Sequence, residues 1–355
     1  MQQCQRILIA ALWATFFSLP AADVVPRHHA TLTQAEPRQD TPGTPAALMG
    51  QPVLGYVTQS SPLRMHAILG VPGSAVLSGP MPLPARVTRL HAAPGQAYAL
   101  AERLGDDPAV LALQAGKALQ AVELAGALRL PDLVVFSPTG RTVLLYSAAA
   151  SLQVVTGLPG TPRVARTVGA GAFPQGIQDA AVSDDGASVL LASAGGAYRL
   201  LADGQTQPVL STAGSAALAF FPNSSQAAIG DRILGSVYLW PAATGPVSVN
   251  LLSSGLAGLG EMRATADGQG LWITDPNANS IRRLSSHTGE VQTFHLPVSP
   301  GRMDRLPYGE MFLVSSAAGQ PAWIFLREGD QTLTVFVPPA RERARPILRP
   351  EETNR

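Results

Sequence analysis

The chain has 355 residues, of which 46% are hydrophobic and 14% charged, and its formal net charge is +1. Soluble domains carry about 25% charged residues, so we expect an unusually neutral surface. Such a balance offers no broad basic field, and it excludes a protein that binds nucleic acid through a cationic surface.

The N-terminus has the pattern of a secretory signal peptide. Arg6 is followed by the apolar run Ile7–Leu19 and then by Pro20-Ala21-Ala22, which supplies small residues for cleavage. The run is shorter than the roughly 20 residues of a membrane-spanning helix. We therefore predict that residues 1–22 are a cleaved signal peptide, with a retained membrane anchor as the alternative, and a protein that is periplasmic or secreted. No later stretch is long and apolar enough to span a membrane.

The single cysteine, Cys4, lies inside this predicted signal peptide. The mature chain would contain no cysteine, which excludes disulfides, thiolate metal sites, covalent c-type haem and cysteine nucleophiles.

Residues 23–50 are rich in Pro, Thr, Gln and Ala without periodicity, and we predict a flexible leader. Residues 51–340 are predicted to form the folded domain. Its first part contains two apolar segments, Val53–Val57 and Leu63–Leu69, which read as strands on either side of a turn. The last residues, 341–355, carry five arginines and three glutamates. They are predicted to be a basic, solvated, disordered tail, and a docking tail is the alternative.

Between these ends one unit recurs six times: an apolar strand, a tight turn, and three further short strands. The first residues of the turns lie 44, 46, 38, 44 and 41 positions apart. The turns are Ala93-Pro94-Gly95-Gln96, Ser137-Pro138-Thr139-Gly140, Ser183-Asp184-Asp185-Gly186, Phe221-Pro222-Asn223-Ser224, Thr265-Ala266-Asp267-Gly268 and Leu306-Pro307-Tyr308-Gly309. A period of about 40 residues with four strands per unit is typical of a β-propeller.

The predicted fold is therefore all-β, a β-propeller of six to seven four-stranded blades. The two segments before the first full unit favour seven, with the extra blade completed by another chain end. The stretch Gln114–Leu128 has a helix-like pattern, but it fills the fourth-strand position of its unit, and we predict a strand in its middle. Trp240, Trp272 and Trp323 are expected to pack between blades; a sugar-binding platform is the alternative.

The fifth unit resembles a known repeat. The segment from Leu271 to Leu284, which contains Trp272-Ile273-Thr274-Asp275-Pro276-Asn277, is similar to the NHL-type and streptogramin-lyase-like propeller repeat. The turns at Ser137 and Ser183 resemble those of the YVTN/lactonase-like propellers. Together the resemblances cover about residues 86–337 and imply a propeller. Asp275 and Asn277 are expected to bond backbone amides and hold the loop between the second and third strands.

No catalytic motif stands out. The sequence has no His-Glu-x-x-His, no Gly-x-Ser-x-Gly and no phosphate-cradling glycine loop, and its six histidines are never paired at ligand spacing. No metal site or cofactor is predicted, although a divalent metal in the channel, held by ligands from separate blades, is left open.

One set of residues is a candidate ligand site. The first strand of each blade lines the channel of a propeller, so equivalent positions should converge on one ring. Four residues before each turn stand Arg89, Leu133, Asp179, Ala217, Glu261 and Arg302. Arg263, Asp304 and Arg305 lie nearby in the same strands. We take Arg89, Asp179, Glu261, Arg263, Arg302 and Asp304 as candidate ligand-binding residues for a polar or anionic small molecule. Self-compensating ion pairs that fill the channel are the alternative.

The sequence thus favours a monomeric extracytoplasmic propeller that acts as a non-catalytic binding or scaffold module for a protein or a small polar ligand. The alternative is a lactonase- or streptogramin-lyase-like enzyme that acts at the central channel.

Overall fold

A computed structural model of the chain describes residues 52–105, 107–114, 119–173, 175–241, 246–315, 322–329 and 331–338. The predicted signal peptide, leader and C-terminal tail lie outside the described residues, and they stay predictions. In the described part, no helix is both long and apolar enough to cross a membrane.

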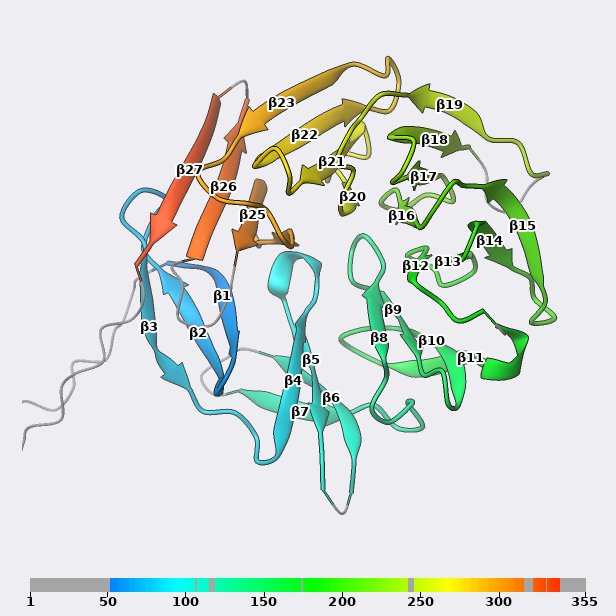
Figure 1. The fold of residues 1–355 in the computed structure, drawn as a ribbon. Helices are drawn as coiled ribbons and strands as arrows, with labels where there is room; N and C mark the ends of the chain where they lie inside the picture. The colour runs from blue at the N-terminus through cyan, green and yellow to red at the C-terminus, as the bar shows by residue number, and fades with distance from the viewer. Residues whose placement is uncertain are drawn as a thin grey trace, which may run out of the picture. The chain divides into compact units, whose positions relative to one another are not determined.

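The described residues form seven antiparallel sheets around a central channel, and each sheet is one blade of a propeller (Figure 1). Strands follow one another in chain order from the centre outward. Blade 1 holds β1 (Val53–Ser60), β2 (Leu63–Leu69) and β3 (Val76–Met81); blade 2 holds β4 (Val87–Ala92), β5 (Ala99–Arg103), β6 (Ala109–Gln114) and β7 (Gln120–Glu123); blade 3 holds β8 (Leu133–Phe136), β9 (Thr142–Tyr146), β10 (Ser151–Thr156) and β11 (Arg163–Gly169).

The remaining blades have the same order. Blade 4 holds β12 (Asp179–Val182), β13 (Val189–Ser193), β14 (Gly196–Leu200) and β15 (Thr206–Ser211); blade 5 holds β16 (Ala216–Phe220), β17 (Ala227–Asp231), β18 (Ser236–Trp240) and β19 (Asn250–Ser253); blade 6 holds β20 (Met262–Ala264), β21 (Gly270–Asp275), β22 (Ser280–Ser285) and β23 (Val291–His295); blade 7 holds β24 (Asp304–Arg305), β25 (Glu310–Ser315), β26 (Ala322–Glu328) and β27 (Gln331–Val337). Two short 3-10 helices, η1 (Pro94–Gln96) and η2 (Ala170–Ala172), complete the described elements.

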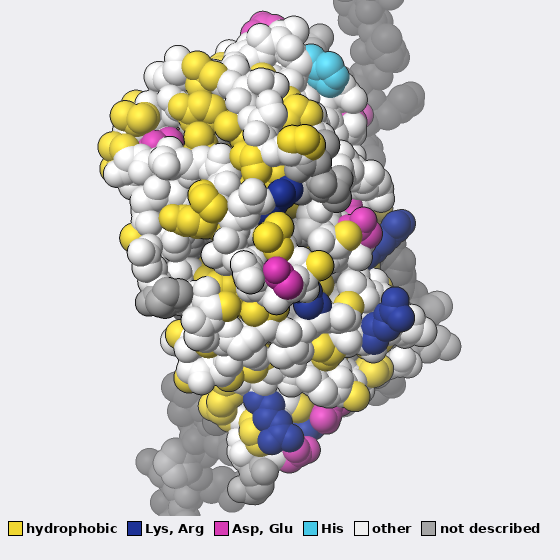
Figure 2. All heavy atoms as spheres, turned by 90° about the vertical axis from the view of Figure 1, so that its right-hand side faces the viewer, with side chains coloured by type: hydrophobic (Ala, Val, Ile, Leu, Met, Phe, Trp, Pro, Cys, Tyr) yellow, Lys and Arg dark blue, Asp and Glu magenta, His cyan; other side chains and the backbone are white. Residues whose placement is uncertain are grey.

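The burial of each strand follows its place in the blade. Every residue of β9 and β16 is buried, because both faces of a middle or inner strand are covered by neighbouring blades. The outer strand β11 instead alternates between exposed and half-buried residues, as expected for a strand with one solvated face. The outer side of the ring in Figure 2 carries few charged side chains among many apolar and uncharged ones, as the composition predicts.

The recurring turn connects the first and second strands of a blade, and it lies at one end of the channel. In blade 4 the Ser183 Oγ accepts the Ser188 N–H at 2.9 Å and donates to Asp185 at 2.6 Å. Gly186 has φ +73°, a left-handed conformation that favours glycine. Asp184 of the same turn accepts the Thr139 N–H at 2.9 Å from blade 3 and the Asn223 N–H at 2.7 Å from blade 5. The repeated turn therefore also ties neighbouring blades together.

Seven blades are confirmed. Blade 1 has three strands in the described part of the chain, and its third strand, β3, is one that the sequence did not predict. No described strand from the C-terminal end pairs with it. Ring closure depends on side-chain packing between blades 1 and 7, in a core that includes Leu54 and Ile68 from blade 1 and Leu313 and Ile324 from blade 7.

Two further predictions are confirmed. The helix-like stretch contains strand β7. Trp240 and Trp272 are almost fully buried in cores between blades, which is the packing role expected for them.

The loop predicted around Asp275 is present, and Asp275 holds it as expected. The expectation that the Asn277 side chain also bonds backbone amides is wrong: it is exposed and accepts no amide of the described residues. One oxygen, Asp275 Oδ1, accepts the backbone N–H groups of Asn277 and Ala278 at 3.1 and 3.0 Å. The other oxygen, Oδ2, forms an ion pair with Arg282, and only 3% of the Asp275 side chain is exposed. Blade 5 uses the same device without the Asn: Asp231 accepts two amides of the loop that follows it, at 2.9 and 3.0 Å.

Replacing Asp275 with alanine should destabilise the protein strongly. The change leaves two loop amides and the largely buried Arg282 guanidinium without their partner. We expect a loss of about 3 kcal/mol in the free energy of unfolding, the usual result of breaking a buried ion pair from one side. Urea unfolding measures it. Asp107→Ala is the control, because the Asp107 side chain is 71% exposed and should contribute less than about 1 kcal/mol. Equal losses in the two variants would contradict this account of the loop.

Candidate functional site

A cavity of about 300 Å³ lies at the centre of the ring. It is lined by the first strands of blades 3 to 7 and by the end of the first strand of blade 2. In each of blades 2 to 7, the residue directly before the first turn faces the cavity. These positions, which we call the turn-end ring, are Ala92, Phe136, Val182, Phe220, Ala264 and Arg305. Five of them are apolar.

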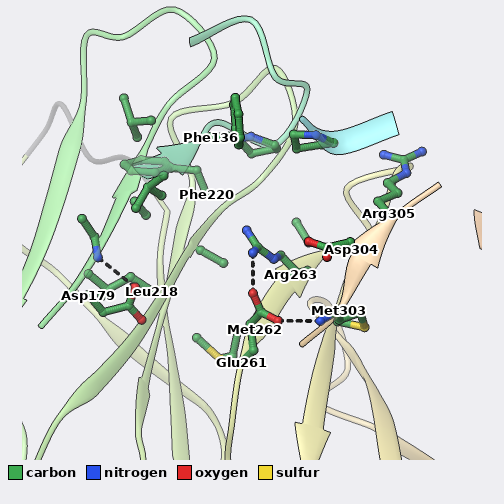
Figure 3. A pocket seen from close by; sticks show the side chains of 18 of the residues that line it. Phe136, Asp179, Leu218, Phe220, Glu261, Met262, Arg263, Met303, Asp304 and Arg305 are labelled. Carbon is green, nitrogen blue, oxygen red and sulfur yellow. Dashed lines mark hydrogen bonds and ion pairs between the residues drawn. The ribbon is translucent and has the colours of Figure 1, made fainter. Parts of the chain in front are cut away.

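The other charged side chains of the cavity stand one to three residues before the turn-end ring. In Figure 3, Asp179 and Glu261 lie toward one end of the cavity, and Phe136, Phe220 and Arg305 toward the other. The charged end is made of Asp179 from blade 4, Glu261 and Arg263 from blade 6, and Arg302 and Asp304 from blade 7. The structure thus brings together five of the six ligand-binding residues that the sequence proposed.

Glu261 joins blades 6 and 7 (Figure 3). Its Oε1 pairs with Arg263, and its Oε2 accepts the backbone N–H of Met303 at 2.8 Å. The Glu261 carboxylate raises the pKa of Arg263, against the opposing effect of burial. Both oxygens of Glu261 are therefore engaged, and Arg263 is held as a cation inside the cavity.

Asp179 is the charged residue of blade 4. Its Oδ1 accepts the Ala180 N–H at 2.8 Å, and its Oδ2 lies 3.3 Å from Arg232 Nη2. Burial raises the pKa of Asp179 and outweighs the opposite effect of Arg232. Arg232 comes from the loop between β17 and β18, and its Nε also donates to the Gly260 carbonyl at 3.4 Å. One arginine thus connects blades 4, 5 and 6.

Asp304 pairs with Arg302 across a distance of 2.8 Å. Burial raises the pKa of Asp304, and the nearby cations of Arg302 and Arg263 only partly offset that rise. Each carboxylate of the charged end therefore faces a guanidinium. The end is a network of ion pairs with donors and acceptors close together.

Arg89 lies apart from this network. A β-bulge between Val87 and Arg89 shifts the register of β4 against β5, and bulges re-aim side chains. The Arg89 side chain is 61% exposed and lies 3.7 Å from Glu102, which also pairs with His91 at 2.7 Å. It does not line the cavity. Position four before the turn thus fails to predict the site in blade 2, where the strand is irregular.

Sequence reasoning missed several residues of the cavity. It gave no role to Phe136 or Phe220, and it named Arg305 as a neighbour of the charged positions without selecting it, although the position directly before each turn would have selected all three. Arg232 follows Asp231, and aligning Ile229-Gly230-Asp231 with Ile273-Thr274-Asp275 places it in the equivalent loop. Its contact with Asp179 crosses from blade 5 to blade 4, so no spacing within one unit reveals it.

The charged end does not fit a metal ion. Among the described residues, no group of three or more His, Cys, Asp or Glu side chains is arranged to hold one. The carboxylates of Asp179, Glu261 and Asp304 are each bonded to an arginine, and two of them also accept backbone amides. Their arrangement suits a ligand with its own donors and acceptors better than a bare cation.

Comparison with known proteins supports the fold. No family model matches the chain, and no curated protein matches it in sequence. Among solved structures it is similar to a periplasmic gluconolactonase of Pseudomonas aeruginosa, with a TM-score of 0.53 and 18% identity over 79% of this chain and 95% of that one. A candidate 6-phosphogluconolactonase from Bacteroides fragilis gives 0.51 and 15% over 83% and 96%. A streptogramin B lyase gives 0.50 and 12% over 74% and 86%.

These likenesses confirm the propeller fold that the two resemblances in the repeat sequence implied. At 12 to 18% identity they establish a shared fold, and a shared propeller is compatible with many functions.

The raised pKa of Asp304 predicts a particular pH dependence. Because the folded state holds this proton more tightly than the unfolded state, Asp304 contributes most to stability near and below its ordinary pKa of 3.8, and that contribution is lost as the pH rises. As the pH falls from 7 to about 4, the free energy of unfolding of wild type should therefore rise relative to that of Asp304→Asn. Urea unfolding of both proteins at the two pH values measures the difference. A wild type that loses stability relative to the variant on acidification would contradict the assignment.

Proposed function

We propose that this protein is a non-catalytic binding module whose central cavity holds one small polar ligand. The observation that carries the proposal is the charged end of the cavity, where Asp179, Glu261, Arg263, Arg302 and Asp304 converge from three blades. A few convergent polar groups in a concave, otherwise apolar site are the usual features of a small-molecule pocket.

The size of the cavity supports a small ligand. About 300 Å³ is the lower end of the range for ligand pockets, which extends from about 300 to 1,000 Å³. Because the inner strands belong to packed blades, the site is also largely pre-formed, which reduces the ordering cost of binding.

The lining supports binding more than catalysis. Among the described residues that line the cavity, there is no His, Ser, Thr, Cys, Lys or Tyr. A nucleophile or base would have to be Asp179, Glu261 or Asp304, and each is already paired with an arginine. The alternative, a reaction on a small ester or lactone like that named for the gluconolactonase, is favoured by one observation: the raised pKa values of Asp179 and Asp304, which would suit proton transfer.

A location outside the cytoplasm belongs to the same proposal. It is supported by the signal-like N-terminal sequence and by the periplasmic gluconolactonase among the similar structures. Fractionation of cells that express the full chain, with N-terminal sequencing of the product, tests it. Recovery of mature protein beginning near residue 22 outside the cytoplasm is expected, and an unprocessed cytoplasmic chain would contradict it.

The binding role predicts ligand-dependent stabilisation that requires Glu261. Wild type is screened by thermal unfolding against sugar acids, amino acids and short polyols, and at least one is expected to raise the melting temperature by mass action. Glu261→Gln removes a charged acceptor and should weaken that ligand about tenfold or more. Wild type and Glu261→Gln are compared by the rise in melting temperature that the ligand causes in each, because the substitution also changes the melting temperature of the protein without ligand. Glu290→Gln, at an exposed loop position, is the matched control.

Hydrolysis of gluconolactone, followed with a pH indicator, separates this proposal from its alternative. We expect a rate equal to that in buffer. Lactone hydrolysis that is lost in Asp304→Asn and kept in Glu290→Gln would contradict the non-catalytic role and support the enzyme.

A further inference from the structure

Arg305 differs from the rest of the turn-end ring. It is the last residue of β24, and its five counterparts in blades 2 to 6 are alanine, valine or phenylalanine. Figure 3 shows it at the end of the cavity where Phe136 and Phe220 lie. A single guanidinium therefore stands among apolar ring positions, and in the chain it directly follows Asp304, which is paired with Arg302.

No side chain in the described part of the chain accepts a hydrogen bond from Arg305 or forms an ion pair with it. The carboxylates whose charge reaches it are those of Glu310 and Asp267. Glu310 is bonded to Arg327 at 2.9 Å. Asp267 accepts the Thr265 hydroxyl and the Gln269 N–H within its own turn. Each therefore has one oxygen bonded elsewhere, and neither forms a hydrogen bond or an ion pair with the guanidinium of Arg305 among the described residues.

The half-buried guanidinium of Arg305 lowers the stability of the protein when no ligand is bound. Arg305 is half-buried, and burial lowers its pKa because the cation is partly removed from water. A desolvated charge without a partner destabilises a folded protein. A ligand that supplied the missing negative charge would recover this cost, so the arrangement favours an anion.

The pairing of the other arginines leads to the same conclusion. The cations of Arg232, Arg263 and Arg302 are each paired with one carboxylate. The three arginines and three carboxylates that line the cavity balance in number, but Arg305 is the arginine among them that has no ion-pair partner in the described part of the chain. A ligand with one carboxylate would supply that partner.

We propose that Arg305 is the anion-binding group of the cavity, and that the ligand is a small amphipathic monoanion. Its carboxylate would accept two parallel hydrogen bonds from the planar guanidinium, and its apolar part would pack against Phe136 and Phe220. This inference rests on the proposed binding function and names the ligand class for that same cavity.

The test compares benzoate with benzamide, which has nearly the same shape without the charge. Isothermal titration of wild type should give a benzoate dissociation constant at least about tenfold lower than that of benzamide, as expected for a charged hydrogen bond. Arg305→Met should weaken benzoate by about tenfold or more and leave benzamide nearly unchanged. Arg163→Met is the matched control, because Arg163 is an exposed arginine outside the cavity. This variant should bind benzoate and benzamide with the affinities of wild type.

The outcomes separate this inference from the proposed function. Equal affinities of wild type for benzoate and benzamide would overturn the anion site, and this comparison needs no variant to fold. Undiminished benzoate binding by folded Arg305→Met would also overturn it. If benzamide still binds and Glu261→Gln weakens it, the proposed function stands without the anion site. If neither probe binds at about 10 mM, where a millimolar dissociation constant gives nearly full occupancy, the anion site is overturned, and the thermal screen with sugar acids, amino acids and polyols decides the proposed function.

A second measurement uses the empty protein. Loss of an unpaired, partly buried cation should leave the melting temperature of Arg305→Met equal to or above that of wild type. Arg263→Met should lower it, because the half-buried carboxylate of Glu261 loses its ion-pair partner. A fall in Arg305→Met as large as that in Arg263→Met would show that Arg305 stabilises the empty fold, and it would overturn the inference.

Discussion

Every blade of this propeller has two apolar faces, and only the neighbouring blades can cover them. The core between blades 4 and 5 contains Leu190 and Trp240, and the core between blades 1 and 7 closes the ring with Leu54 and Ile324. Burial of apolar surface is the dominant favourable term in folding, so no blade is stable alone. The closed ring then fixes the inner strands, and with them the spacing of the charges around the channel.

Much of the fold could be predicted from the sequence, because tight turns can be recognised from a few neighbouring residues. Turns such as Ser183-Asp184-Asp185-Gly186 require particular residues, and their recurrence about every 40 positions revealed the blades. Two features of the fold have no such pattern in the sequence. Strand β3 contains Gly79 and Pro80, which are poor strand formers. Closure of the ring joins residues nearly 270 positions apart, such as Leu54 and Ile324, through nonspecific apolar packing.

The site was only partly predictable, and for a different reason. Counting back from each turn places Asp179, Glu261 and Arg302 correctly, because regular strands keep equivalent residues at equivalent depths. The same count fails at Arg89, where a β-bulge changes the register, and at Ala217, which does not line the cavity. The importance of Arg305 depends on which neighbours are already bonded elsewhere. That information comes from contacts between side chains, which a spacing rule cannot supply.

The central claim is that the channel of this propeller is a binding site, with its charged end and turn-end ring acting on one small molecule. A crystal structure of the protein soaked with benzoate tests it most directly. The account predicts density for the ligand inside the cavity, with its carboxylate against Arg305 and its ring beside Phe136 and Phe220. A cavity that holds only water, with benzoate absent or bound elsewhere on the surface, would contradict it.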